Sequence, residues 1–436
     1  MSALMSQYNY NVQKGYLHED LSALPTERSD TFPVRYIAYY LPQFHTIDVN
    51  DQAWGVGFTE WTNSTKALPR YVGHYQPRMP ADLGFYNLKN VDVIEKQANL
   101  ASRGGIYGFC IHYYWFSGKK VLEKPLSLIL KNPQIDINFC INWANENWTR
   151  KWDGQRGTIL LKQEYNSEDP LRFAQDLVEI IQDKRYIRID GRPLIMLYRA
   201  SLVPEVKKTV DIWREFLTRA GLGNPFVIMP QADEQDDPRL FGLDGAAGFP
   251  PHKFHHGLQN DRRYLHVLDA EFEGKVIAYD RIMKRALECR PSEFPYFPGL
   301  FTAWDNEARI DNLAFSFYGS TPKKYGEWLY SASQQALGAA SPDARIVFIN
   351  AWNEWAEGAY LEPDRHFGFA YLAETRRVFD AIKGRNLGRN AVQGSGDVPP
   401  TYGARQFVAQ PRVDRLFRNA YFALRRRVQR RMEDAS

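Results

Sequence analysis

The sequence predicts an α/β protein that folds as a (β/α)8 TIM-type barrel with long βα loops. Eight apolar segments of strand length alternate with segments of helical periodicity along most of the 436-residue chain. These segments are continuous apolar runs, which is typical of parallel strands buried on both faces. Polar and aromatic residues gather where the runs end, as expected for a barrel whose strand ends meet at one face. A doubly wound open sheet is the alternative, but no Gly-x-Gly-x-x-Gly follows the first run.

The predicted elements follow one another in a regular order. After the first run, the segment "VDVIEKQANLASRGG" places Val91, Ile94, Ala98 and Ala101 on one face of a helix. A turn at Asp190-Gly191 introduces the fourth run. The runs expected to form strands are residues 36–44, 108–115, 136–143, 192–199, 226–230, 244–249, 299–304 and 345–352.

The two ends of the chain differ from the barrel region. We expect a polar N-terminal tail at 1–33, the barrel domain at 34–385, a linker at 386–411 and a basic amphipathic helical tail at 412–436. In that last segment apolar residues recur at helical spacing and arginines occupy much of the remainder. A helix of this kind at 412–432 can contact an anionic membrane, or it can pack on its own domain with the arginines in solvent.

Composition narrows the class of protein. Charged residues at 24% and hydrophobic residues at 44% are typical of a globular chain. The net charge of +4 does not favour a nucleic-acid partner, and the three cysteines form no disulfide framework. The N-terminal sequence lacks the pattern of a secretory signal, and no apolar run approaches about 18 residues. We therefore expect a cytoplasmic location, with peripheral contact at the inner face of the cell membrane as an option.

We expect neither a cofactor nor a metal ion. The sequence contains no Gly-rich phosphate loop and no Asp-x-Asp triplet. The acidic segment 231–237 could hold a cation, but it could equally cap a loop. The histidines of "PPHKFHHG", at 252, 255 and 256, could bind zinc or contact a substrate.

The segment "NAWNEWAEGAYLEPD" (350–364) carries the strongest catalytic signal. Glu354 and Glu357 follow the last predicted strand, so both are expected at the mouth of the barrel. Two carboxylates there can divide the work, one remaining ionised as a base or nucleophile while the other serves as the acid. Glycoside chemistry needs that division, because the leaving oxygen must be protonated as the C1–O bond breaks. Spacing alone also allows two surface glutamates in a loop.

Other candidate residues cluster at the predicted strand ends. Side chains there could bind sugar hydroxyls or stack on sugar rings, or they could form a polar network that braces the barrel mouth. Strand alternation allows only one parity of "HYY" (112–114) to point inward. The candidate substrate-binding residues are Glu60, Trp61, His112, Tyr113, Tyr114, Trp143, Asn145, Glu146, Trp304, Asp305, Asn306, Asn353 and Trp355.

Several long tryptophan-rich stretches resemble the WbsX-type glycosyltransferase family, which is similar to glycoside hydrolase family 99. The resemblance extends over roughly residues 34–385. The stretches are "YYLPQFHTIDVNDQAWGVGFTEWTN" (39–63), "GHYQPRMPADLGFYNL" (73–88), "GIYGFCIHYYWFSGKKVLEKPL" (105–126), "NWANENWTRKWDG" (142–154), "RYIRIDGRPLIMLYR" (185–199), "AWDNEAR" (303–309) and 350–364.

The resemblance implies a mechanism and a setting. Family 99 enzymes are (β/α)8 barrels that cleave internal α-mannosidic bonds with retention, and their motif is Glu-Trp-His-Glu-Gly. Here the motif reads Glu354-Trp355-Ala356-Glu357-Gly358, so both acids match and Ala356 replaces the histidine. By this resemblance Glu354 deprotonates the sugar 2-hydroxyl, which attacks C1 to form a 1,2-anhydro sugar, while Glu357 protonates the leaving oxygen. WbsX-type proteins are associated with O-antigen and other bacterial surface polysaccharides.

Two hypotheses remain open from the sequence. The first is a retaining glycan-active enzyme that makes or cleaves glycosidic bonds in a glycan or a lipid-linked oligosaccharide. The second is a non-catalytic glycan-binding or scaffold protein of a polysaccharide assembly complex. Retention of both glutamates favours the first, since a protein that only binds has little use for an acid and base pair.

Overall fold

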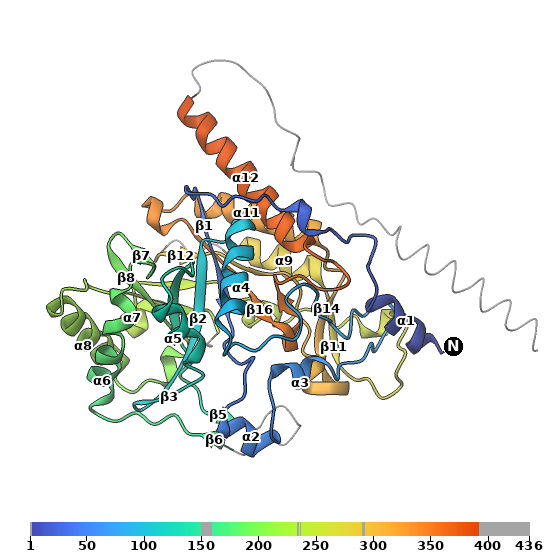
Figure 1. The fold of residues 1–436 in the computed structure, drawn as a ribbon, viewed down its shortest axis with the longest axis horizontal. Helices are drawn as coiled ribbons and strands as arrows, with labels where there is room; N and C mark the ends of the chain where they lie inside the picture. Colours follow the sequence, from blue (N-terminus) through green and yellow to red (C-terminus); the bar gives the residue numbers. More distant parts are fainter. Residues whose placement is uncertain (1, 150–158, 233–234, 236, 290–292, 392–436) are drawn as a thin grey trace, which may run out of the picture. The chain divides into compact units, whose positions relative to one another are not determined.

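The computed structural model describes residues 2–149, 159–232, 235, 237–289 and 293–391. Its central feature is a sheet of nine parallel segments in the order β12-β10-β9-β8-β4-β2-β1-β15-β13, which two short antiparallel strands extend. The two outermost segments, β12 (Tyr296–Phe297) and β13 (Gly299–Phe301), are consecutive in the chain and are separated only by Pro298. The sheet is therefore nearly closed, which is consistent with the predicted (β/α)8 barrel (Figure 1).

All eight predicted strand runs contain a strand of this sheet, so the α/β fold is confirmed. The register follows the apolar runs directly; in the pair of β1 and β15, for example, Tyr36 lies opposite Val347 and Ala38 opposite Ile349. The other strands of the barrel are β1 (Arg35–Tyr40), β2 (Gly108–Phe116), β4 (Asn138–Trp143), β8 (Arg192–Leu197), β9 (Phe226–Pro230), β10 (Gly245–Ala247) and β15 (Ile346–Asn350).

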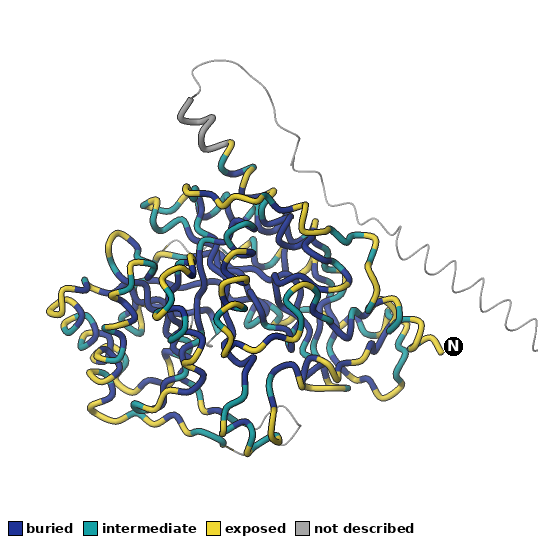
Figure 2. Tube along the Cα trace, in the orientation of Figure 1, coloured by how far each residue is buried: buried dark blue, intermediate teal, exposed yellow. Residues whose placement is uncertain are grey.

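Helices surround these strands in Figure 1, and Figure 2 shows that the buried residues concentrate in the strands and on the inner faces of the helices. The strands exclude water on both faces because the helices cover the outside and large side chains fill the inside. The helices are α1 (Ala3–Asn11), α2 (Asp48–Trp54), α3 (Glu60–Ser64), α4 (Val91–Arg103), α5 (Lys124–Lys131), α6 (Asp169–Asp176), α7 (Val178–Gln182), α8 (Val206–Arg219), α9 (Tyr279–Glu288), α10 (Glu307–Ile310), α11 (Pro322–Ala336) and α12 (Ala370–Ala391).

Several short strands lie in the loops between the barrel strands and the helices. Asp190 and Gly191 both have positive φ, at 49° and 78°, and form the expected turn between β7 (Arg188–Ile189) and β8. The long loop after β1 contains α2 and α3, and the segment after β15 forms a small hairpin. The remaining strands are β3 (Lys119–Val121), β5 (Trp148–Thr149), β6 (Ile159–Leu161), β11 (Lys275–Ala278), β14 (Phe315–Tyr318), β16 (Asn353–Glu354) and β17 (Ala359–Tyr360).

The N-terminal segment, predicted as an irregular polar tail, instead contains α1 and packs on the barrel. Asn11 is buried, and its side-chain amide donates to the carbonyl oxygens of His74 and Gln76 at 2.6 and 2.8 Å. The backbone of Glu19 exchanges hydrogen bonds with Phe367 and Phe369. The sequence pattern did not predict this helix, because its few apolar residues do not recur at helical spacing.

The C-terminal predictions are only partly covered by the structure. Helix α12 runs to Ala391, so it includes the first residues of the predicted linker at 386–411. The predicted basic helix at 412–432 lies outside the described residues. In the part of the chain that is described, no helix combines the length and apolarity needed to cross a bilayer.

Candidate active site

A cavity of about 250 Å³ opens at the carboxyl ends of the barrel strands. Tyr39 comes from β1, His112 and Tyr114 come from β2, and Tyr198 follows directly after β8. Asn350, the last residue of β15, completes the same rim. In a (β/α)8 barrel this is the face that carries active sites.

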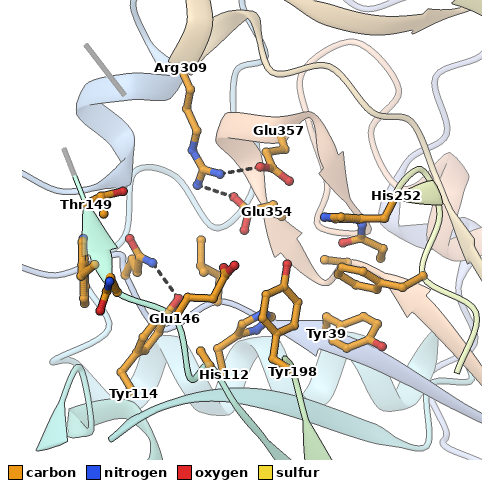
Figure 3. Close-up of a pocket in the computed structure, with 18 of the residues that line it drawn as sticks. Tyr39, His112, Tyr114, Glu146, Thr149, Tyr198, His252, Arg309, Glu354 and Glu357 are labelled. Carbon is orange, nitrogen blue, oxygen red and sulfur yellow. Dashed lines mark hydrogen bonds and ion pairs between the residues drawn. The ribbon is translucent and has the colours of Figure 1, made fainter. Parts of the chain in front are cut away.

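Glu354 and Glu357 both line this cavity (Figure 3). Glu354 ends β16, which pairs with β17 in a tight hairpin, and Glu357 lies in the single 3-10 turn between the two strands. Gly358 closes that turn with a φ of 61°, and a Cβ atom there would approach the Arg78 guanidinium to 2.6 Å. The position therefore needs glycine, and the hairpin holds both acids toward the cavity.

A single arginine connects the two acids. Arg309, from α10, donates through Nη1 to Glu357 Oε1 at 2.7 Å and through Nη2 to Glu354 Oε1 at 2.8 Å. Nη2 also contacts Glu60 Oε2 at 3.0 Å. The second oxygen of Glu357 accepts from Trp304 Nε1 at 3.1 Å. Three carboxylates thus share one guanidinium, and the cluster carries excess negative charge.

Burial and this crowding act on Glu354. Desolvation is the largest influence and raises the pKa of Glu354 well above its usual range, and the neighbouring charges of Glu357 and Glu60 raise it further. The contact with Arg309 opposes both effects. A raised pKa makes the carboxylate a stronger base when it is ionised and also favours its protonated form, so this environment suits a group that takes up and releases a proton.

The opposite wall of the cavity is aromatic and uncharged. Burial lowers the pKa of His112 to about 4 and that of His252 to about 4, so both imidazoles are neutral at pH 7. His112 Nδ1 lies 3.3 Å from the carbonyl oxygen of Tyr40, so Nδ1 donates and Nε2 is left as an acceptor. Burial also raises the pKa of Tyr198 above its usual range, which keeps its hydroxyl protonated. This wall offers ring faces and neutral hydrogen-bonding groups.

Five of the predicted site residues line the cavity together. They are His112, Tyr114, Glu146, Glu354 and Glu357. Strand β2 resolves the question of parity, because its even-numbered residues face the cavity while Tyr113 packs near Phe173 behind it. Glu146 is half-exposed at the rim, where it pairs with Arg199 at 2.9 Å.

The other predicted substrate-binding residues lie outside the cavity lining. Glu60 bonds to Arg309, which in turn pairs with both acids, and Trp304 donates directly to Glu357 from outside the lining. Asn353 and Asn306 hold backbone groups, since they bond to Leu41 and to the amide of Phe315. The remaining six are buried in the surrounding packing: Trp61, Tyr113, Trp143, Asn145, Asp305 and Trp355.

Sequence reasoning missed Arg309 and Tyr198 as members of the site, whereas the sequence itself offers His252 as a zinc ligand or a substrate contact. Arg309 is separated by 45 and 249 positions from the acids Glu354 and Glu60 that it contacts. The only signal was the stretch "AWDNEAR", in which Arg309 follows the seventh strand. A search for a compensating cation at a strand end could have found it.

The structure shows no candidate metal cluster among the described residues. The acidic segment 231–237 falls partly outside those residues. His252 lines the cavity, whereas His255 Nδ1 lies 2.9 Å from the carbonyl oxygen of Pro251 and its ring packs against His256. The three histidines therefore do not converge on one point in the described structure.

Comparison with known proteins places this site in a family. The family described as glycosyltransferase WbsX matches residues 36–375, which is most of the chain and includes both acids and Arg309. The chain belongs to the WbsX glycosyltransferase family.

Two relatives of this WbsX-family chain come from strains of Xanthomonas campestris pv. campestris, and each is named uncharacterized protein WxcX. Both are 39% identical over 382 residues, which is 84% of this chain and 54% of the relative. The chain thus spans about half the length of these curated relatives.

Solved structures support the fold of the WbsX-family chain. A glycoside hydrolase-like protein aligns at a TM-score of 0.52 and 15% identity, over 81% of this chain and 96% of that one. The GH99 endo-α-mannosidase of Bacteroides thetaiotaomicron aligns at a TM-score of 0.51 and 13% identity, over 82% of this chain and all of that one. At such identities the likeness concerns the fold alone.

Proposed function

We propose that this chain is a retaining glycan-active enzyme that makes or cleaves glycosidic bonds during the synthesis of bacterial surface polysaccharide. The observation that carries the proposal is the convergence of Glu354 and Glu357 on one cavity at the carboxyl end of the barrel. The family description supports a role on glycans. The structural neighbour from Bacteroides thetaiotaomicron is an endo-α-mannosidase, which favours an α-mannosidic bond. The substrate would be a glycan or a lipid-linked oligosaccharide, encountered in the cytoplasm.

In the proposed reaction the substrate supplies its own nucleophile. The Glu354 carboxylate takes the proton of the sugar 2-hydroxyl, and that oxygen attacks C1. The bond from C1 to the leaving oxygen breaks, and Glu357 gives its proton to that oxygen. The product of this step is a 1,2-anhydro sugar. Because the nucleophile and C1 belong to one ring, their approach costs little translational or rotational entropy.

A second step returns both acids to their starting states. The Glu357 carboxylate takes a proton from water or from an acceptor hydroxyl, and that oxygen attacks C1. The epoxide bond from C1 to O2 opens, and Glu354 gives its proton back to O2. Two inversions at C1 give net retention. Water as the attacking group yields hydrolysis, and a sugar hydroxyl yields transfer.

The surroundings of the acids support these roles. The raised pKa of Glu354, caused first by burial, suits a base that must act on a weakly acidic hydroxyl. The rings of Tyr39, Tyr198 and Phe249 line the other side of the cavity, where they can pack against a sugar face. Ala356 occupies the position of the histidine in the family 99 motif, and its side chain is buried.

A panel of α-mannosyl oligosaccharides and nucleotide sugars, followed by mass spectrometry, tests the proposal. We expect turnover by the native chain on an α-mannoside and a loss of roughly 10²- to 10⁴-fold for Glu357→Gln, because general acid catalysis contributes about that much. The control is Glu95→Gln on the exposed face of α4, which should keep full activity. Full activity of Glu357→Gln would overturn the assignment of the acid, and binding without turnover across the panel would favour the glycan-binding alternative.

A further inference from the structure

Glu60 is a buried carboxylate that does not line the cavity. It is fully shielded from solvent, and its Oε2 contacts Arg309 Nη2 at 3.0 Å. Its other oxygen has no hydrogen-bond partner among the described residues. Burying a carboxylate with so few partners is costly, so its position calls for an explanation other than packing.

The helix that carries Glu60 is fixed against the catalytic hairpin. Thr59 caps α3 by accepting from the amide of Trp61, and Trp61 Nε1 donates to the carbonyl oxygen of Tyr86 at 2.8 Å. The ring of Trp61 also packs at a centroid distance of 5.5 Å against Trp355, which lies between the two acids in sequence. Glu60 is thus held in place relative to Glu354 and Glu357.

Arg309 is contacted by carboxylates on two sides, and the Glu60 contact anchors it on the side away from the cavity. The cavity acids hold its guanidinium from the substrate side, and Glu60 holds the same Nη2 from the protein side. When a sugar enters between the acids, it competes for the hydrogen bonds of Glu354 and Glu357. Of these three contacts, only the one with Glu60 is made by a carboxylate outside the cavity lining.

We propose that Glu60 is a positioning residue that holds Arg309 within reach of both acids, and that this pair adjusts the strength of Glu354 as a base. The proposal rests on the function proposed above for the two acids. Arg309 stabilises the ionised form of Glu354, while Glu60 limits that effect by sharing the same guanidinium and adding its own negative charge.

Other titratable groups face the two acids and must be considered. His112 is neutral at pH 7 because burial lowers its pKa to about 4. The tyrosine hydroxyls keep their protons, since burial raises the pKa of Tyr114 and of Tyr198 above the usual range. Glu146 also lines the cavity, where it pairs with Arg199 at the rim. Arg309 is the charged group that bonds directly to both acids, and Glu60 is its buried partner.

Two substitutions should move the acids in opposite directions. Glu60→Gln keeps an amide oxygen that can accept from Arg309 Nη2, so Arg309 stays in place while a negative charge is removed. More of the Arg309 field is then left to Glu354, and the pKa of Glu354 should fall. Arg309→Met removes the positive charge, so that pKa should rise. A merely structural role would damage the site in both variants and would not produce shifts of opposite sign.

The test compares the pH dependence of kcat/KM in the native chain, Glu60→Gln, Arg309→Met and Arg309→Lys. Since the base must be ionised, we expect the acidic limb to move down by about one pH unit in Glu60→Gln and up by at least that much in Arg309→Met. Arg309→Lys should restore part of the native limb. Shifts of the same sign, or an unchanged limb in Glu60→Gln, would overturn the proposal.

A second readout separates this inference from the proposed reaction. The side-chain carboxyl of Glu354 can be titrated by NMR in the full chain labelled with ¹³C-glutamate, with Glu354→Gln used to assign its signal. We expect a lower apparent pKa of Glu354 in Glu60→Gln than in the native chain. If the native chain shows no turnover, the proposed function fails, whereas an unchanged titration of Glu354 would refute the role of Glu60 alone.

Discussion

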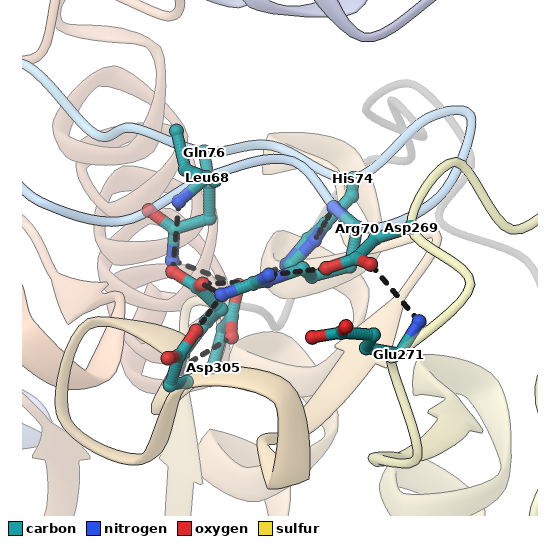
Figure 4. A network of polar contacts seen from close by, with 9 residues as sticks. Leu68, Arg70, His74, Gln76, Asp269, Glu271 and Asp305 are labelled. Carbon is teal, nitrogen blue, oxygen red and sulfur yellow. Dashed lines mark hydrogen bonds and ion pairs between the residues drawn. The ribbon is translucent and has the colours of Figure 1, made fainter.

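Two clusters built around an arginine lie on either side of the segment 304–311, and they differ in what they face. In one, Arg309 holds Glu60, Glu354 and Glu357 beside the cavity. In the other, Arg70 contacts Glu307, Asp269 and Asp311, none of which lines that cavity (Figure 4). Each cluster consists of one arginine and three carboxylates, so charge content alone does not distinguish a catalytic site from a structural network.

In the second cluster the buried side-chain atoms of Arg70, Glu307 and Asp305 have hydrogen-bond partners, whereas in the first Glu60 Oε1 has none among the described residues. Arg70 Nε donates to Glu307 Oε1 at 2.7 Å, and the amide of Leu68 donates to Glu307 Oε2 at 2.9 Å. His74 accepts from the amide of Arg70 through Nδ1, so Nε2 carries the proton that it shares with Asp305 at 2.5 Å. We call residues 70, 74, 76, 269, 305, 307 and 311 the clamp. The clamp fixes the segment from which Arg309 reaches the cavity and Trp304 donates to Glu357.

One carboxylate of each cluster, Asp305 in the clamp and Glu354 at the cavity, shows this contrast in its pKa. Burial alone would raise the pKa of Asp305, but His74, Arg78 and the amide of Glu307 outweigh it and hold that pKa below its usual range. Glu354 has the opposite sign, with a raised pKa. A carboxylate with a lowered pKa stabilises the folded chain at neutral pH, whereas one with a raised pKa costs stability there. A raised pKa does not by itself mark a site, because burial and the charge of Asp305 also raise the pKa of Glu307 in the clamp. Glu354 differs from Glu307 in that it lines the cavity.

The largest effect is expected from breaking the clamp. Glu307→Gln leaves Arg70 with a weakened buried partner and should lower the free energy of unfolding by about 3–5 kcal/mol. Urea unfolding followed by circular dichroism measures it. The matched control is Glu271→Gln, an exposed neighbour that should change stability by less than about 0.5 kcal/mol. Equal effects of the two substitutions would show that the clamp is not a brace.

The clamp should also carry an acid-sensitive part of the stability. Asp305→Asn should cost about 1.5–3 kcal/mol at pH 6–7, because hydrogen bonds to a charged group are lost. The lowered pKa means that this contribution is complete above the unfolded value near 3.9 and disappears as pH falls through the folded value. Unfolding measured at pH 7, 5 and 3 should therefore show the gap between native chain and variant closing only in the most acidic sample.

The cavity cluster should respond with the opposite sign. Glu354→Gln removes a carboxylate whose pKa is raised, and the folded chain should become more stable at pH 7 by about 0.5–2 kcal/mol. The gain should vanish as pH falls toward the unfolded value near 4, because the native Glu354 is then protonated in both states. Thermal unfolding at pH 7 and pH 4 tests it. A loss of stability at pH 7 would place Glu354 with the clamp residues.

The smallest effect is expected from Trp304→Phe, which tests whether Trp304 contributes to catalysis or only to packing. Trp304→Phe keeps the ring that packs on Phe315 but removes the donor to Glu357 Oε2. We expect a change in kcat of about three- to tenfold, the worth of a hydrogen bond of roughly 0.5–1.5 kcal/mol, with stability little altered. Phe315→Leu is the matched control for the ring contact. A larger stability loss than activity loss in Trp304→Phe would assign the indole to packing.

The sequence alone determined the order of strands and helices and the place of the acid pair. Runs such as "RIVFINAW" are apolar on both faces because each strand is covered twice, and that signal is local. Glu354 and Glu357 were predictable for the same reason, since both follow the last strand and the carboxyl ends of parallel strands meet at one face.

Tertiary structure alone decided the roles of the surrounding residues. Tryptophans 61, 143 and 355 fit a sugar site and a core equally well by composition, and only packing shows that they are buried. Arg309 lies 249 positions from Glu60, so no local pattern could reveal their contact. Charge pairing across such separations depends on where loops from different strands come together, and that is settled by the closed barrel rather than by any single segment.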